Sequence, residues 1–175
     1  MKQILAVTLF VAFAFVTSGT GRVPAQQDSE ESAVEATVRD FEEAAQEYNH
    51  AKVLSLLTPD TRWIESSLPA KVDDLEWPQF EKAKAAGVRI TNRPHDFETH
   101  VQGDVAWVTL TLDSTFSADS AEGQKWLQGL KDYCLSQAPS VSCEAIFVES
   151  EVLVKTPSGW KIALGHTSLL PKAQK

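Results

Sequence analysis

Two pairs of strand-like segments, each joined by a tight turn, constrain the fold of this chain more than any other feature. Segments 88–101 and 105–116 flank Gln102-Gly103-Asp104, and segments 144–155 and 160–169 flank Pro157-Ser158-Gly159. Turn residues between alternating apolar segments predict β-hairpins, and hairpins build antiparallel sheets. Pro94 argues against a fully paired central position for the first of these segments.

Helical periodicity appears before the hairpins and in one interruption between them. Five apolar residues recur at steps of four and three, which predicts one face of a helix: Val34, Val38, Phe41, Ala45 and Tyr48. A short second helix is expected after the cap residue Asn49, a strand over 62–66, and a third helix over 79–86. Helical spacing returns within 117–142. The order predicts an α+β fold, with helices packed on an antiparallel sheet.

The first 25 residues have the three parts of a secretory signal peptide. Lys2 supplies a positive charge, residues 4–16 are apolar, and small residues lead to Ala25. The apolar segment is shorter than the ~20 residues that a transmembrane helix needs. We therefore expect export to the periplasm or the medium, with cleavage after Ala25. The alternative is an uncleaved membrane anchor.

The remainder of the chain has the size of one domain. Residues 26–32 are polar and are expected to form a mobile tail, followed by one domain over 33–172 with a helical insertion at about 117–142. Removing residues 1–25 takes away Lys2 and Arg22 and no acid, which leaves a net charge of −10. Such a charge opposes binding to nucleic acid and to anionic lipid. We expect no nucleic-acid partner and no membrane insertion after cleavage.

The sequence contains two cysteines, Cys134 and Cys143. Export would place them in an oxidising compartment, where pairing is favoured. Two free thiols are the alternative, and no neighbouring Cys or His completes a zinc site. We predict a disulfide, no metal site and no cofactor.

Three stretches, in this order, resemble the SnoaL-like branch of the nuclear transport factor 2-like superfamily. They are YNHAKVLSLLTPDTRWIES after the first helix, GDVAWVTLTL in the first hairpin and VLVKTPSGWKIALGHTS at the end. The resemblance covers about residues 30–172 apart from the 117–142 segment. It implies a strongly curved antiparallel sheet wrapped around the N-terminal helices, an internal pocket and a homodimer. Because relatives include isomerases, cyclases, dehydratases and proteins that only bind ligands, it implies no single reaction.

The last strand raises a question about His166. Trp160, Ile162, Leu164 and His166 occupy alternate positions, so a regular strand places all four on one face. If the first three pack on the helices, the imidazole reaches the cavity, where it could act as a base. The alternative is a structural histidine that bonds a backbone carbonyl or Ser168.

Glu65 shares a strand face with Trp63, in the strand that the resemblance places in the cavity wall. An apolar wall would raise the pKa of Glu65 and make it a general base. The alternative is a carboxylate on an exposed rim. The predicted catalytic residues are His166 and Glu65, and the predicted ligand contacts are Trp63, Tyr48, Phe80, Trp107, Trp160 and Ser168.

Other ionisable side chains are expected on the outside of the sheet. Asp113 lies opposite the more apolar face of its strand, and the alternative is that its own face turns inward and Asp113 joins the pocket. Glu149 and Glu151 share a face with Lys155. Residues 95–100 contain His95, Asp96, Glu98 and His100 and are expected at a solvated strand edge. Glu98 and His100 share a face there, but two ligands without a third make a weak metal site.

The sequence lacks the motifs of several enzyme classes. It has no Gly-rich phosphate loop, no H-E-x-x-H and no G-x-S-x-G. We expect an exported protein that binds a small, largely apolar molecule in the cavity of the sheet. Cofactor-free isomerisation, cyclisation or dehydration is the candidate chemistry. The competing hypothesis is a non-catalytic dimer or protein-interaction module that uses the sheet face.

Overall fold

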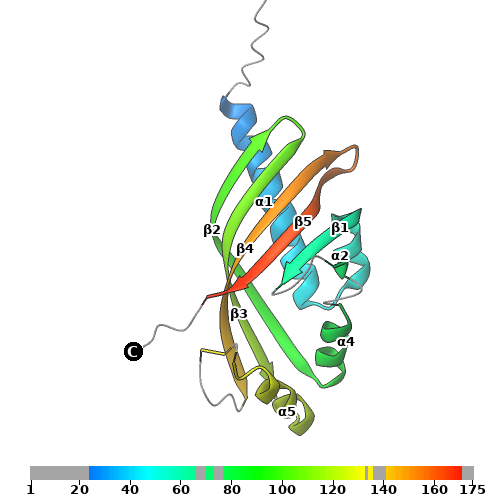
Figure 1. The fold of residues 1–175 in the computed structure, drawn as a ribbon, viewed down its shortest axis with the longest axis vertical. Helices are drawn as coiled ribbons and strands as arrows, with labels where there is room; N and C mark the ends of the chain where they lie inside the picture. The colour runs from blue at the N-terminus through cyan, green and yellow to red at the C-terminus, as the bar shows by residue number, and fades with distance from the viewer. Residues whose placement is uncertain (1–23, 66–69, 73–76, 133, 136–140, 171–175) are drawn as a thin grey trace, which may run out of the picture.

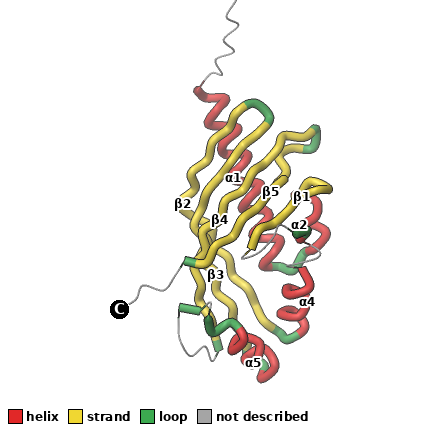
Figure 2. Tube along the Cα trace, in the orientation of Figure 1, coloured by secondary structure: helices red, strands yellow, loops and turns green. Residues whose placement is uncertain are grey.

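The chain folds as a curved sheet packed on a long helix. The computed structural model describes residues 24–65, 70–72, 77–132, 134–135 and 141–170. Within this part five strands pair in the order β1-β5-β4-β3-β2. Helix α1 runs behind the strands, and α5 lies at the far end of the β2–β3 hairpin (Figures 1 and 2). The α+β class predicted from the sequence is confirmed.

Two hairpins supply four of the five strands, as predicted. β2 (Val88–Gln102) pairs antiparallel with β3 (Val105–Ala118), and β4 (Ser142–Thr156) pairs antiparallel with β5 (Gly159–Leu169). Gly103 and Gly159 lie in the two turns with φ angles of 65° and 107°, which strain residues that carry a side chain. β2 is an edge strand, a position that tolerates proline.

The first strand departs from the antiparallel prediction. β1 (Leu57–Glu65) pairs in parallel with β5, so the sheet is mixed. No hairpin joins β1 to its neighbour, so local turn chemistry does not set its direction. The pairing places Trp63 beside Gly165 and Glu65 beside Thr167.

Helix α1 (Pro24–Gln46) buries the apolar face that its periodicity predicts. Val34 and Val38 are fully buried against the sheet. The helix begins before the predicted domain, because residues 26–32 are helical rather than a loose tail. Glu30 accounts for this difference, since its carboxylate accepts hydrogen bonds from Trp160 Nε1 and Lys155 Nζ and ties the first turns of α1 to the second hairpin.

The predicted signal peptide lies outside the described residues up to position 23. Its cleavage therefore stays a prediction. Among the helices of the described part, none is both long and apolar enough to cross a membrane. The described elements share one main core between α1 and the sheet, with a smaller adjoining core around α5.

The two short helices form where the sequence predicts them. α2 (His50–Leu56) starts at the cap residue Asn49, whose side chain accepts a hydrogen bond from the backbone nitrogen of Lys52. α4 (Trp77–Ala85) has Pro78 in its first turn and is followed by Gly87, with a φ of 76°. Proline at the start and glycine after the end are typical helix boundaries.

The insertion between β3 and β4 contains helix α5 (Ala121–Gly129), capped by the Ser120 side chain. Cys134 and Cys143 form the predicted disulfide, and both are fully buried. Leu127 of α5 packs in the same core cluster as the two cysteines. The disulfide therefore anchors the segment after α5 to the start of β4.

β5 contains a bulge that the sequence analysis missed. Ile162 pairs with Leu153 of β4, and Leu164 pairs with Val152, the residue just before Leu153. Ala163 is therefore an extra residue in β5. A bulge of this kind moves every later side chain of the strand to the opposite face.

Because of the bulge, the four residues predicted to share one face of β5 lie on two different faces. Trp160 is buried in the core as expected. Beyond the bulge, however, Gly165 is buried and Thr167 points inward, whereas Leu164 is 37% exposed and His166 lies on the outer face with it. The prediction failed because it assumed unbroken alternation from Trp160 to His166.

Gly165 leaves the space that the Trp63 ring occupies. A Cβ atom added at Gly165 would lie 2.4 Å from atoms of the Trp63 indole, which is closer than atoms can pack. On its other side, the indole stacks on Phe41 of α1, with ring centroids 5.2 Å apart. The missing side chain thus lets an aromatic pair fill the space between β5 and α1.

Candidate functional site

An open pocket of about 480 Å³ lies between the inner face of the sheet and the helices. Its lining is largely apolar and includes several aromatic rings. Each of the five strands also contributes one polar side chain to the lining, and α1 adds Glu42: the strand residues are Glu65, Asn92, Ser114, Glu149 and Thr167. An apolar pocket of this size with a few converging polar groups is typical of small-molecule sites.

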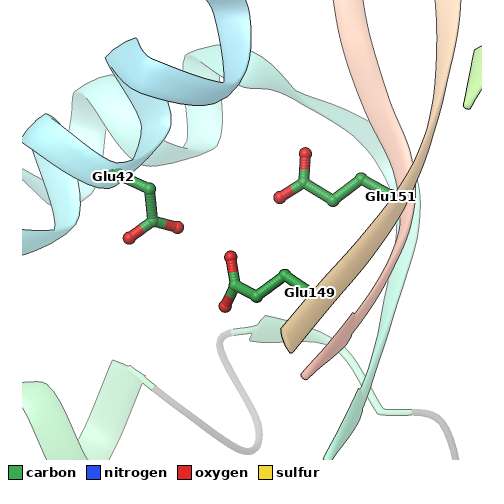
Figure 3. A group of neighbouring side chains, drawn as sticks. All are labelled: Glu42, Glu149 and Glu151. Atoms are coloured by element: carbon green, nitrogen blue, oxygen red, sulfur yellow. The ribbon is translucent and has the colours of Figure 1, made fainter. Parts of the chain in front are cut away.

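Three glutamate side chains converge between α1 and β4 (Figure 3). Glu42 projects from α1, and Glu149 and Glu151 project from the same face of β4. One carboxylate oxygen of each lies within 4.8 Å of the others. Their exposed fractions are 4%, 3% and 1%. Glu42 and Glu149 line the pocket, and Glu151 lies beside them.

Side chains from three other strands hold the two glutamates of the cluster that line the pocket. Asn92 Nδ2 donates to Glu42 Oε2 at 2.7 Å, and Thr167 Oγ1 donates to Glu149 Oε1 at 3.0 Å. Trp63 Nε1 in turn donates to Thr167 Oγ1 at 2.9 Å. The series Trp63–Thr167–Glu149 therefore fixes the orientation of one carboxyl in the pocket wall.

The cluster raises the proton affinity of its members. Burial raises the pKa of Glu149 to about 7; hydrogen bonds from Thr167 and with Glu42 act against this shift, and the charge of Glu65 adds to it. Burial also raises the pKa of Glu151 well above its ordinary value, and the charge of Glu149 adds to that effect. Both shifts favour the neutral carboxylic acid.

Ionised glutamates would leave several oxygen atoms of the cluster without a donor. Glu149 Oε2 and both carboxylate oxygens of Glu151 have no hydrogen-bond partner among the described residues when all three groups are ionised. A hydrogen bond between the carboxyls of Glu42 and Glu149 requires a proton on one of them. Adjacent buried charges are costly without compensation. Protons or a bound cation must therefore neutralise the cluster.

Glu65 and Trp63 lie in the pocket wall, where the sequence analysis placed them. Burial raises the pKa of Glu65, as expected for a carboxyl in an apolar wall. Glu65 is half-buried, in contrast to the buried Glu149. The wall thus contains two carboxyls of raised pKa in different degrees of contact with solvent.

His166 and Ser168 do not line the pocket. They lie on the outer face of β5, where His166 Nε2 and Ser168 Oγ are 3.1 Å apart. The expectation that the imidazole looks into the cavity is wrong, because the bulge at Ala163 turns it outward. Its bond to Ser168 matches the alternative of a structural histidine.

The remaining predicted ligand contacts divide into three groups. Phe80 lines the pocket. Tyr48 lies outside the lining: it packs edge-on against Phe80, and its hydroxyl donates to the Val88 carbonyl at 2.9 Å. Trp160 is buried in the main core, and Trp107 is 43% exposed on the outer face. The predictions that Tyr48, Trp107 and Trp160 contact the ligand are therefore corrected.

The prediction that Glu149 and Glu151 are exposed is wrong. It relied on Lys155, which shares their side of β4, but Lys155 lies near the strand end and reaches the first turns of α1 instead. The β3–β4 register would have identified the buried face, since Glu149 pairs with Leu110 and Glu151 with Val108. The insertion before β4 hides that register, because no short turn connects the two strands.

The acidic and imidazole groups of β2 and β3 lie outside, as expected. Asp113 is on the outer face, with its Oδ1 at 3.4 Å from His95 Nε2, and Asp96 Oδ2 is 3.0 Å from His95 Nδ1. The nearby carboxylate of Asp113 contributes most to raising the pKa of His95, and Asp96 adds to it. These groups do not belong to the pocket lining.

Sequence comparison identifies no relative: no family model matches the chain, and no curated protein matches it.

Solved structures, in contrast, share the fold at low sequence identity. A candidate dehydratase of the NTF2-like family from Streptomyces avermitilis is 18% identical, with a TM-score of 0.63 over 82% of this chain and 98% of that chain. A ketosteroid isomerase-like protein from Erwinia carotovora is 17% identical, with a TM-score of 0.56 over 82% and 98%. The association domain of C. elegans CaMKII is 13% identical, with a TM-score of 0.61 over 82% and 98%. At these identities the likeness establishes the fold alone.

Proposed function

We propose that this chain, which has the nuclear transport factor 2-like fold, binds a small, largely apolar molecule in its pocket and transfers protons on it. The fold agrees with the resemblance in the sequence. One observation carries the proposal: the carboxyl of Glu149 is buried in the wall of a pocket of about 480 Å³ that is otherwise largely apolar. The dehydratase and isomerase-like descriptions of similar structures support the same class of chemistry.

Glu149 has the properties of a general acid–base. Its pKa of about 7 means that both protonation states are populated near neutral pH, which is the condition under which a carboxyl exchanges protons most effectively. The ionised form would take a proton from a carbon next to an electron-withdrawing group of the ligand. Returning that proton to another carbon gives isomerisation. Transfer of a proton from Glu42 to a departing hydroxyl gives dehydration.

Glu65 is proposed as a second carboxyl of the same site. It lines the pocket, and its raised pKa fits the predicted role of a base. In this proposal it assists the buried Glu149 and acts on parts of the ligand closer to solvent.

The first test measures isomerisation of a β,γ-unsaturated cyclic ketone to its conjugated isomer by ultraviolet absorbance. Glu149→Gln should lower kcat at least ~100-fold, because it removes the acid–base group. His166→Gln, on the outer face, is the matched control and should retain the wild-type rate. A wild-type rate in Glu149→Gln would reject Glu149 as the base. If the protein neither turns over nor binds apolar probes, the proposal fails as a whole.

A non-catalytic, self-associating protein is the second candidate function. Three apolar side chains are unusually exposed on the outer face of β3 and β5: Val105 at 44%, Trp107 at 43% and Leu164 at 37%. Exposed apolar side chains grouped on a sheet face are typical of an interface. The likeness to a CaMKII association domain supports this candidate.

Self-association is tested by analytical ultracentrifugation of the wild type and Trp107→Glu. A homodimer through the outer face should dissociate at least ~10-fold more readily in the variant, because the substitution buries an unpaired charge. A monomeric wild type, or a dimer that Trp107→Glu leaves intact, would reject this interface.

Export is proposed on the basis of the signal-peptide pattern and the Cys134–Cys143 disulfide. Disulfides persist mainly in oxidising compartments. Mass spectrometry of the protein recovered from an expressing cell would show both the loss of residues 1–25 and the bonded cysteines if the proposal holds.

A further inference from the structure

The ionisable side chains that line the pocket are all carboxyls, which are negative when they are ionised. Among the described residues they are Glu42, Glu65 and Glu149, and no Lys, Arg or His belongs to the described lining. A carboxylate or phosphate ligand would be repelled by such a wall, whereas a cation would be attracted. The lining therefore selects ligands by charge as well as by apolar contact.

The same wall contains an acceptor that needs a donor. With the cluster ionised, Glu149 Oε2 receives no hydrogen bond from the described residues, although the atom is buried. Glu149 Oε1 already accepts a bond from Thr167, so the carboxyl is oriented with one oxygen satisfied and the other open. Buried acceptors are normally satisfied, and a ligand N–H would satisfy this one.

Aromatic rings around the pocket favour an organic cation over a metal ion. Trp77 and Phe80 lie with ring centroids 5.6 Å apart, and Trp126 is part of the same lining. Ring faces attract ammonium groups, and their apolar surface packs against hydrocarbon. A metal ion with its water shell would use the carboxylates but gain nothing from the rings.

We propose that the natural ligand of this pocket carries a protonated amine on an apolar, ring-sized body, with the ammonium held between Glu42 and Glu149. The inference rests on the proposed function, since it concerns the same pocket. The ammonium takes the place of the proton that the two carboxyls otherwise share, and it donates to Glu149 Oε2. Binding of the ammonium therefore leaves Glu149 ionised, which is the form that acts as a base.

The test compares three probes of nearly equal shape and different charge by isothermal titration calorimetry at pH 7.5. They are 1-naphthylmethylammonium, 1-naphthalenemethanol and 1-naphthoate. We expect the ammonium to bind at least 10-fold more tightly than the alcohol, and the naphthoate to show no binding. In Glu149→Gln the ratio of ammonium to alcohol affinity should fall below 3. Glu144→Gln, an exposed glutamate of the same strand, should retain the wild-type ratio, and thermal melts establish that both variants fold.

The possible negative results distinguish the proposal of an amine ligand from the proposed function of the pocket. If the alcohol binds as tightly as the ammonium, or if Glu149→Gln keeps the wild-type ratio, the charge preference is rejected and the apolar pocket stands. If none of the three probes binds, both proposals fail. If 1 mM CaCl₂ or MnCl₂ alone raises the Tm of the wild type and not that of Glu149→Gln, the cation is a metal ion and the amine proposal is overturned.

Discussion

The two faces of the β4–β5 hairpin carry polar groups in very different surroundings. On the inner face, Thr167 and Glu149 are joined by a hydrogen bond of 3.0 Å in the wall of the pocket. On the outer face are the two neighbours of Thr167 in the sequence, His166 and Ser168. Their Nε2 and Oγ atoms are 3.1 Å apart, and both residues are in contact with solvent. Burial shifts the pKa of the inner carboxyl to about 7. The comparison teaches that burial, more than residue type, makes a polar group a candidate for acid–base chemistry.

The largest expected effect on stability comes from adding a side chain at Gly165, on the inner face of β5. In Gly165→Ala the new Cβ would displace the Trp63 ring, since the two would lie 2.4 Å apart. Overpacking of this kind costs about 1–3 kcal/mol, and the Tm should fall by roughly 2–12 °C. Gly129→Ala is the control, because an added Cβ there meets no atom within 4 Å. A thermal melt of Gly165→Ala that matches the wild type would show that Trp63 has an alternative position.

The second effect is a loss of stability as the pH rises. The folded-state pKa of Glu149 is about 7, above its ordinary value of 4.5. Between these values the folded chain binds more protons than the unfolded chain, so stability is highest at the acid end and falls as the pH approaches 7. One group contributes at most ~1.4 kcal/mol per pH unit. Thermal melts between pH 5 and 8 measure this slope.

Glutamine substitution distinguishes the contribution of the buried cluster to the pH dependence of stability from that of the other acids. Glu149→Gln should flatten the pH dependence of the Tm, and the double variant Glu149→Gln/Glu151→Gln should flatten it further, because Glu151 shifts in the same direction. Glu42 and Glu65 face the same cluster and remain titratable in both variants. A wild-type Tm that rises between pH 5 and 7 would contradict the buried carboxyl cluster.

The smallest effect compares two adjacent residues of β5. Thr167→Val removes the donor to Glu149 and the acceptor of Trp63 Nε1, and should destabilise the fold by about 1–2 kcal/mol. His166→Ala changes only an outer-face contact and should stay within ~0.5 kcal/mol of the wild type. Urea unfolding measures both. Equal losses in the two variants would mean that the inner and outer faces differ less than the structure indicates.

Local signals in the sequence predicted most of the fold. The Gly103 and Gly159 turns, the Asn49 cap and the boundaries of α4 all depend on residues within a few positions of one another. The direction of β1 and the bulge at Ala163 depend on pairing between distant strands. Periodicity contains no information about such pairing, so these two features were predicted incorrectly.

The candidate site was only partly predictable for the same reason. Trp63 and Glu65 were placed in the pocket wall from strand facing and the family resemblance, and Phe80 was also predicted to contact the ligand; all three line the pocket. Glu149 was missed because glutamate is rarely buried and because the insertion before β4 hides its alignment with the apolar face of β3. His166 was placed wrongly by one extra residue in its strand.

The bulge at Ala163 also affects how proteins with the same pocket can be recognised. It sets the spacing between the Trp-containing start of β5 and the inward pair Gly165 and Thr167, which lie beside Glu151 and Glu149. A homologue with the same chemistry should keep Glu-x-Glu on the fourth strand, Gly-x-Thr on the fifth and the same number of residues between them. If the same residues paired without the bulge, His166 would take the place of Thr167 beside Glu149. An imidazole would then replace the threonine in the pocket wall and mark a protein with a different ligand.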